Sequence, residues 1–203
     1  MIRAFWGGIC AGAIAACTPV APAQTVALAG GDVSVTTPAG YCVDGQASTP
    51  RNGFAVLAPC ATLGAQTGAP SVIGVATVQV GAPESGTIMD DEAALRDFLI
   101  TDAGNALLSS EGEGADVTIL STQAFDNQVM VHFADAGPAP LAGLQPEEWR
   151  AFTRANGRLV TIAVRGLAQA PLQDGPGAGL LKLVISGVKA VTSAAPAATP
   201  AAI

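Results

Sequence analysis

The sequence predicts an α+β fold in which helices pack on an antiparallel β-sheet, in the order β-β-β-β-α-β-β-β-β-α. Three observations predict it: short β-branched runs between turn residues, two segments with apolar residues at helical spacing, and an Asn156-Gly157 pair typical of a tight hairpin. Half of the residues are hydrophobic and only 12% are charged, so one apolar core is expected. We place this single domain at residues 32–191.

Residues 1–16 are predicted to be a secretory signal peptide. Arg3 supplies a positive charge, and residues 4–16 form a small, apolar run that is shorter than the roughly 20 residues that span a bilayer. Ile14-Ala15-Ala16-Cys17 resembles a bacterial lipobox, so we expect Cys17 to be acylated. Cleavage after Ala23 is the alternative, because Ala21-Pro22-Ala23 fits the small-x-small pattern. Both routes predict export.

The segments that flank the domain are rich in alanine and proline. Residues 17–31 are expected to be a flexible, lipid-anchored tether, and residues 192–203 a disordered tail. The residue after Cys17 is Thr18, not the aspartate that would resemble an inner-membrane retention signal. The predicted location is therefore the cell envelope, facing the periplasm, with the lipid in the outer membrane.

Cys42 and Cys60 are the cysteines left after the leader is removed and Cys17 is acylated. An even pair in an oxidising compartment predicts a disulfide, worth about 3 kcal/mol for a loop of this length. C-x-x-C is absent and the only histidine is distant, so we expect no metal and no other cofactor. The formal net charge of −7 opposes binding to nucleic acid.

The first half of the domain is predicted to contain four strands, followed by a helix. The strands are expected at residues 33–35, 41–43, 54–57 and 72–80. Thr87 and Asp90 resemble a capping box at the start of the helix. The stripe predicted to face the core consists of Leu95, Phe98, Leu99, Ala103 and Leu107.

Two hairpins are expected next, and the turns set their register. A type I′ turn at Asn156-Gly157 aligns Trp149 with Val164, Ala151 with Ile162 and Thr153 with Val160. A turn at Asp126-Asn127 aligns Leu120 with Phe133, Thr122 with Val131 and Ser121 with His132. A closing helix over residues 180–191 is predicted to follow the helix-breaking sequence Gly175-Pro176-Gly177. It is predicted to bury Leu180, Leu181, Val184, Val188 and Val191.

This order of elements resembles the PsbP-like α/β/α sandwich. The resemblance rests on the Thr37-Pro38-Ala39-Gly40-Tyr41 turn, the Asn156-Gly157 hairpin and the closing amphipathic helix, and it covers about residues 32–191. It implies a binding or accessory module, since members of that fold group are mostly non-catalytic and several are lipoproteins. It carries over no active-site residue.

Three groups of residues are candidates for chemistry. His132, the only histidine, is expected beside Ser121, as a nucleophile and base would be, although no G-x-S-x-G turn surrounds the serine. Glu111, Glu113 and Asp116 lie on one glycine-rich loop but match no calcium-loop spacing. The third group is basic: Arg150, Arg154, Arg158 and Arg165.

The leading functional hypothesis is a non-catalytic envelope lipoprotein. It is expected to contact the membrane through its lipid and to bind an envelope protein or a cell-wall partner through Arg150, Arg154 and Arg165. The alternative for those arginines is pairing with acidic residues of the same chain. The alternative function is a periplasmic hydrolase that uses Ser121 and His132.

Overall fold

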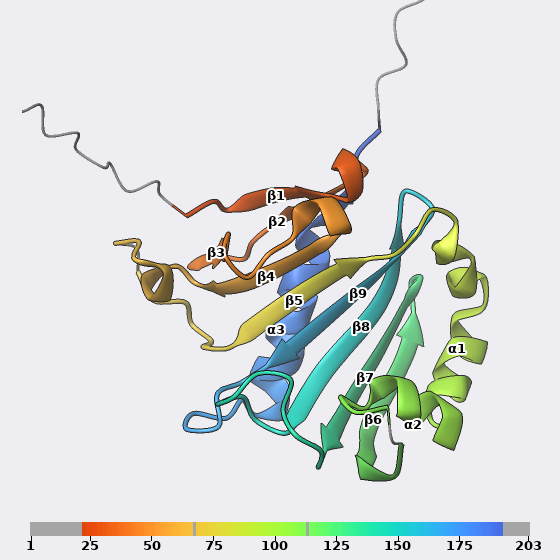
Figure 1. The fold of residues 1–203 in the computed structure, drawn as a ribbon. Coiled ribbons are helices and arrows are strands. Elements are labelled where there is room, and N and C mark those ends of the chain that lie inside the picture. Colours follow the sequence, from red (N-terminus) through yellow and green to blue (C-terminus); the bar gives the residue numbers. More distant parts are fainter. Residues whose placement is uncertain (1–21, 67, 113, 193–203) are drawn as a thin grey trace, which may run out of the picture.

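The computed structural model describes residues 22–66, 68–112 and 114–192 (Figure 1). The α-helices of this part are α1 (Glu92–Leu99), α2 (Asp102–Leu108) and α3 (Asp174–Gly187). Its strands are β1 (Thr25–Leu28), β2 (Val33–Thr36), β3 (Tyr41–Val43), β4 (Phe54–Pro59), β5 (Val75–Val80), β6 (Val117–Phe125), β7 (Gln128–Asp135), β8 (Glu147–Ala155), β9 (Arg158–Arg165) and β10 (Val188–Ala190).

A seven-stranded sheet, ordered β3-β4-β5-β9-β8-β7-β6, forms the middle layer, and every neighbouring pair in it is antiparallel. Helix α3 packs on one face and α1 and α2 on the other (Figure 1). Leu180, Leu181 and Val184 of α3 join the larger apolar cluster, whereas Leu95 and Leu99 of α1 join the smaller one. The predicted α+β class and its α/β/α layering are confirmed.

Both hairpin turns lie where the sequence predicts them. Asn156 and Gly157 have φ of 51° and 72°, and Asp126 and Asn127 have φ of 53° and 57°, as a turn with two left-handed residues requires. The pairs Trp149–Val164, Ala151–Ile162 and Thr153–Val160 all form. In the earlier hairpin, Thr122–Val131 and Ser121–His132 form as well.

The predicted pairing of Leu120 with Phe133 is wrong. A β-bulge between Ile119 and Ser121 shifts the register, so that Phe133 pairs with Ile119 instead. Because of the extra residue, Val117 turns toward the core and is buried, while Leu120 is 49% exposed.

The single helix predicted after the fourth strand is two short helices. Thr101 has an extended backbone and its hydroxyl accepts the N–H of Gly104, so it caps α2 and ends the continuity with α1. The cap of α1 is Asp91, which accepts the N–H of Ala94, and the predicted cap at Thr87 is wrong. This break also turns Phe98 and Leu107, expected in the core, toward solvent.

The closing helix begins earlier and ends earlier than predicted. Gly175, Pro176 and Gly177 lie in its first turn, where proline costs no hydrogen bond, rather than in a preceding loop. Val188 begins β10, which pairs with β2, and Val191 is 39% exposed. The predicted tail, residues 192–203, lies outside the described residues except for residue 192.

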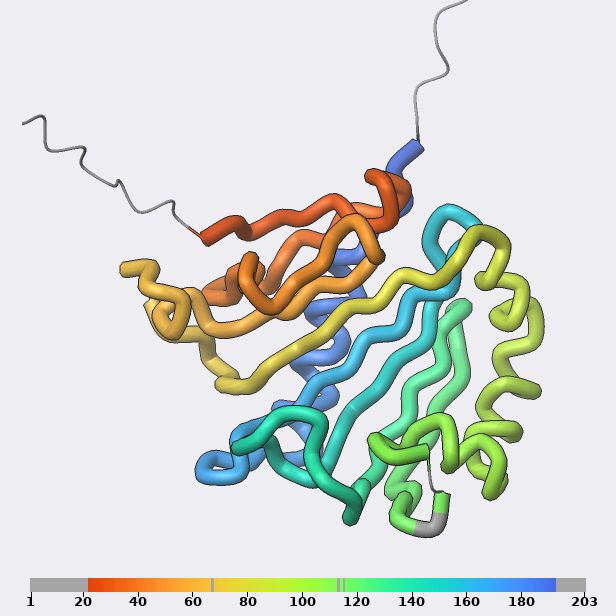
Figure 2. Tube along the Cα trace, viewed as in Figure 1, coloured from red at the N-terminus to blue at the C-terminus, as the bar shows by residue number. Residues whose placement is uncertain are grey.

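A second sheet joins the two ends of the described chain. Its order is β1-β2-β10, and the red N-terminal segment and the blue C-terminal segment lie side by side (Figure 2). The prediction of a flexible tether is therefore wrong for Thr25–Leu28, which pair with Val33–Thr36 as β1. The signal peptide and Cys17 lie outside the described residues.

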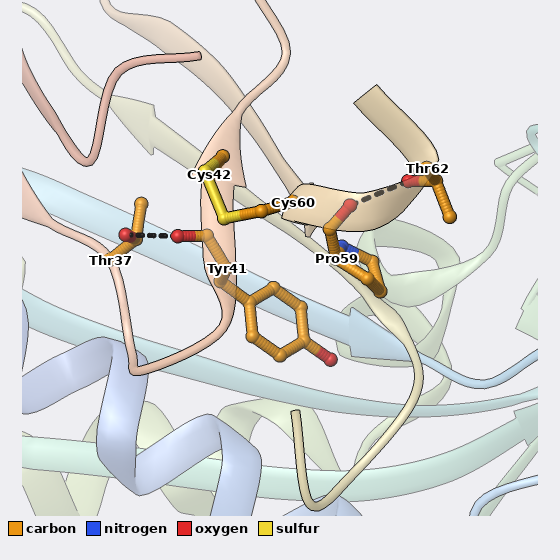
Figure 3. Close-up of a disulfide and its surroundings, with 6 residues drawn as sticks. All are labelled: Thr37, Tyr41, Cys42, Pro59, Cys60 and Thr62. Atoms are coloured by element: carbon orange, nitrogen blue, oxygen red, sulfur yellow. Dashed lines mark hydrogen bonds between the residues drawn. A yellow bond between two sulfur atoms is a disulfide. The ribbon is translucent and has the colours of Figure 1, made fainter. Parts of the chain in front are cut away.

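Cys42 and Cys60 form the predicted disulfide, with Cα atoms 4.8 Å apart (Figure 3). The bond joins β3 to the turn after β4. The ring of Tyr41 points away from the sulfur atoms, and its hydroxyl donates to the carbonyl of Val72 at 2.9 Å. Burial raises the pKa of Tyr41 to about 12. No helix of the described residues has the length and hydropathy needed to cross a bilayer.

Candidate functional site

A cavity of about 290 Å³ lies between α3 and the strands at one side of the large sheet. Strands β6, β7 and β8 supply one wall, and the first half of α3 supplies the other. We call it the α3-face cavity. Its lining is Ser121, Gln123, Met130, Val131, His132, Trp149, Asp174, Gly175, Ala178, Leu181 and Lys182.

Strand register brings the central residues of this cavity into one row. Ser121 pairs with His132, and His132 pairs with Trp149, so all three side chains lie on the α3 face of the sheet. Gly177 leaves the space that Trp149 occupies, since a Cβ at this position would lie 2.4 Å from the indole ring. Helix α3 can therefore approach the indole closely.

His132 is held in a fixed orientation. Its ring stacks on Trp149 with centroids 4.3 Å apart and planes 12° apart, and the residue is only 8% exposed. Despite this burial, Nε2 has no hydrogen-bond partner within the described residues. Two carboxylates lie beside the ring, with Oε2 of Glu147 3.4 Å from Nε2 and Oδ1 of Asp174 3.8 Å from Nδ1.

The Ser121–His132 pair expected for a hydrolase has the predicted register but lacks the geometry of a nucleophile and base. Both side chains line the cavity, yet no hydrogen bond joins them in the described part of the chain. Each imidazole nitrogen lies beside a carboxylate instead. A triad needs one nitrogen on the serine and the other on the acid.

The opposite face of the same strands carries a closed network around Glu148, which we call the Glu148 cluster (Glu148, Arg150 and Arg165). Glu148 is 3% exposed and accepts from Nε of Arg165 at 2.7 Å and from Nε of Arg150 at 2.5 Å. Arg165 also donates to the carbonyl of Gln145 at 3.1 Å. These contacts satisfy most of the buried charge, apart from Nη2 of Arg165, which has no partner among the described residues.

The predicted arginine surface is therefore wrong for Arg165, which is buried. Arg150 is bound to Glu148, and Arg154 forms an ion pair with Asp90, two residues before α1. Arg158 donates to Asp32 through two nitrogens, at 2.7 and 3.0 Å. Each of the four arginines has a carboxylate partner within the chain, which is the alternative left open by the sequence.

Asp135 is a second buried carboxylate on the face of the Glu148 cluster. Burial alone would raise its pKa, but this effect is outweighed by hydrogen bonds from Ser110 and from the N–H of Gly137, and by the charge of Arg165, so that the pKa is lowered. Asp116, of the acidic loop considered as a cation site, ends a short 3-10 turn immediately before β6. Glu113 lies outside the described residues.

A larger hollow lies in the described part of the chain, but the carboxylate in its lining already accepts hydrogen bonds. It measures about 630 Å³ and lies beside β3, with Asp44 in its lining. The carboxylate of Asp44 accepts the N–H groups of Gln46 and Ala47, as in an ordinary turn. The unsatisfied imidazole favours the α3-face cavity as the candidate site.

No family model matches the chain, and no curated protein matches it significantly in sequence. Solved structures do resemble it. A mutant of Mog1 is similar with a TM-score of 0.50 and 12% identity, over 81% of this chain and 94% of that one. The chain has a PsbP-like fold. This agrees with the layer order above and with the resemblance found in the sequence.

Two further structures are similar at lower scores. The Ran-binding protein Mog1p of Saccharomyces cerevisiae has a TM-score of 0.49 and 12% identity, over 81% of this chain and 93% of that one. The cyanobacterial PsbP (CyanoP) of Synechocystis has a TM-score of 0.45 and 13% identity, over 91% and 98% of the two chains. At such identities a PsbP-like fold carries no information about activity or partners.

Sequence reasoning found His132 and Ser121 but missed the two carboxylates. Glu147 precedes Trp149 by two residues, and the pairing of β8 with β9 already placed Trp149 on the apolar face. Alternation along the strand puts Glu147 on that face too, so this signal was available. Asp174 gave none, because residues 175–177 were expected to lie outside the helix.

Proposed function

We propose that this chain is an exported, non-catalytic binding module of the cell envelope, anchored by lipid at Cys17, and that its binding site is the α3-face cavity. One observation carries the choice of site. The buried imidazole of His132 has a nitrogen without a hydrogen-bond partner among the described residues, and it lies beside two carboxylates.

An unsatisfied buried polar group costs about 1–3 kcal/mol, so a fold retains one where it has a use. The Glu148 cluster shows that the same strands can provide partners for buried charge when the role is structural. The α3-face cavity combines apolar walls with a few convergent polar groups, as ligand sites do. Its size suits a small ligand or one side chain of a partner.

The proposed location is supported by the cysteines and by the N-terminal sequence. A disulfide between Cys42 and Cys60 suits an oxidising compartment. The apolar run and the lipobox-like segment before Cys17 support export and acylation. We place the anchor in the outer membrane, with an envelope protein or a cell-wall component as the partner.

Site-specific crosslinking in intact cells tests the binding site. The two lysines, Lys182 and Lys189, are both exposed and both on C-terminal elements, but only Lys182 lines the cavity. With a photoreactive residue at either position, we expect a discrete adduct from 182 and none from 189. The adduct should disappear when His132→Gln is added. Equal labelling from both positions, or an adduct that survives His132→Gln, would contradict the assignment.

Mass spectrometry of the protein recovered from membranes tests the anchor. We expect an N-terminal cysteine at position 17 carrying acyl chains, and a Cys17→Ser variant that is not acylated. A mature chain that begins after Ala23 with no lipid would disprove the anchor while leaving export intact.

The alternative function is a hydrolase that uses Ser121 and His132, and it is favoured only by their shared position in the cavity. A fluorophosphonate probe distinguishes the two functions. We expect no labelling of the folded protein, because Ser121 has no hydrogen bond to His132. Labelling that is abolished by Ser121→Ala would overturn the non-catalytic proposal.

A further inference from the structure

The strongest unexplained feature of the molecule is the side-chain group His132, Glu147 and Asp174. Within the described part of the chain, these three residues form a group that could hold a metal ion. Each offers one ligand atom, and these atoms all lie within 4.8 Å of one another. The residues come from three elements that the sheet and α3 bring together: β7, the start of β8 and the start of α3.

From this geometry we infer that the α3-face cavity binds a divalent transition metal ion of the Zn²⁺ type, with His132 Nε2 and Glu147 as ligands and Asp174 as the residue that orients the imidazole. This inference rests on the proposed function and names the ligand class of the same site. Water molecules or a partner group would complete the coordination.

The distance between the two proposed ligand atoms fits such an ion. Metal–ligand distances near 2.0–2.1 Å in a tetrahedral site separate neighbouring ligand atoms by about 3.3 Å. Nε2 of His132 and Oε2 of Glu147 are 3.4 Å apart, and they do not form a hydrogen bond with each other. An imidazole nitrogen paired with a carboxylate favours Zn²⁺ and its neighbours over Mg²⁺ or Ca²⁺.

Asp174 occupies the position of an orienting carboxylate. Its Oδ1 lies 3.8 Å from Nδ1, the nitrogen that the ion does not use. The side chain is 88% exposed, so a small rotation brings it within hydrogen-bond distance. In carboxylate–histidine–metal arrangements, such a contact fixes the tautomer that leaves Nε2 free for the ion.

The site is also accessible and rigid. Asp174 borders both the α3-face cavity and a second hollow of about 240 Å³ that includes Glu147, so the group lies where two solvent-connected spaces meet. Stacking on Trp149 holds the imidazole plane in place. A ligand that is already oriented loses little freedom when it binds an ion.

Isothermal titration of the untagged full chain with Zn²⁺ tests the inference. We expect one ion per chain, with binding lost in His132→Gln and weakened at least about 10-fold in Glu147→Gln. Asp174→Asn should weaken it about 10–100-fold, the usual effect of removing an orienting carboxylate. Asp97→Asn is the matched control, because it removes the same charge from an exposed site on α1 and should leave affinity unchanged.

Two results would overturn the metal site: no heat of binding in the wild-type protein, or an affinity that falls equally in Asp97→Asn and Glu147→Gln, which would indicate non-specific attraction to an acidic protein. These results would leave the cavity itself standing if crosslinking from position 182 still depended on His132. Loss of the crosslink together with retained Zn²⁺ binding would instead disprove the proposed function alone.

Discussion

Glu147 and Glu148 are neighbours on β8, yet they have opposite roles in this fold. Glu148 points to the α1/α2 face, is 3% exposed and binds two arginines. Glu147 points to the α3 face, where its side chain is 43% exposed and lies beside a histidine that it does not hydrogen-bond. One carboxylate is used to hold the sheet together, and the other remains available.

Hydrogen bonding and exposure together separate the structural carboxylate from the one available to a ligand. A buried acid whose oxygens both accept hydrogen bonds from arginine can take no ligand without losing stability. A half-exposed acid beside an imidazole nitrogen that has no hydrogen-bond partner among the described residues can bind a ligand without breaking a hydrogen bond. The arginines that look like a binding surface in the sequence are therefore structural, while the single histidine marks the site.

The largest expected effect comes from removing the charge of Glu148. Glu148→Gln leaves the buried guanidinium of Arg165 without its carboxylate and should lower the free energy of unfolding by about 3–5 kcal/mol. Glu147→Gln is the matched control and should cost less than about 1 kcal/mol, since the Glu147 side chain is 43% exposed and solvent screens its charge. Denaturant unfolding measures both free energies of unfolding. Equal losses in the two variants would contradict the different roles assigned to Glu147 and Glu148.

The next largest effect is expected where α3 packs closely on the sheet. Gly177→Ala places a methyl group against Trp149 and should destabilise the protein by about 1–3 kcal/mol while displacing α3 from the cavity. Gly179→Ala, two residues on and open to solvent, should stabilise the helix by up to about 1 kcal/mol. If both variants gain stability, Trp149 is not packed against α3 as described.

Asp135 gives the α1/α2 face a distinct dependence on pH. Because its pKa is lowered in the folded protein, its ionised form adds stability that is present above the unfolded value near 3.9 and is lost as pH falls through the folded value. Asp135→Asn should cost about 1–3 kcal/mol at pH 7, and the gap to wild type should narrow below about pH 4. A gap that is constant with pH would contradict the assignment.

The smallest effect is expected at the exposed ion pair of Arg154 and Asp90. Asp90→Asn should change the free energy of unfolding by less than about 1 kcal/mol, because solvent screens the pair. Thermal melts at low and high salt check this value. A loss as large as that of Glu148→Gln would mean that the arginine face depends on all of its pairs.

Much of the fold was predictable because local signals set it. Asn156-Gly157 fixed the register of β8 with β9, and the valine-rich runs located β2 to β5. The bulge at Ile119–Ser121 could not be predicted, since it comes from packing of β6 against β7 rather than from turn chemistry. The pairing of β10 with β2 joins residues far apart in the sequence, which no local pattern records.

The candidate site was only half predictable for the same reason. The Ser121–His132 pairing follows from a hairpin, whereas Asp174 reaches His132 through the placement of α3 on the sheet. Long-range packing of this kind depends on Gly177 and Trp149 fitting together. Nothing in the spacing of residues 132, 147 and 174 suggests a shared ligand site.

The most direct test is an imidazole ¹⁵N NMR titration of the untagged protein with Zn²⁺, since His132 is the only histidine and its signals need no assignment. We predict that the ¹⁵N chemical shift of Nε2 moves to that of a metal-bound nitrogen while Nδ1 keeps its proton. Unchanged imidazole signals at saturating Zn²⁺, with the protein folded, would contradict the claim that His132 forms the metal-binding site.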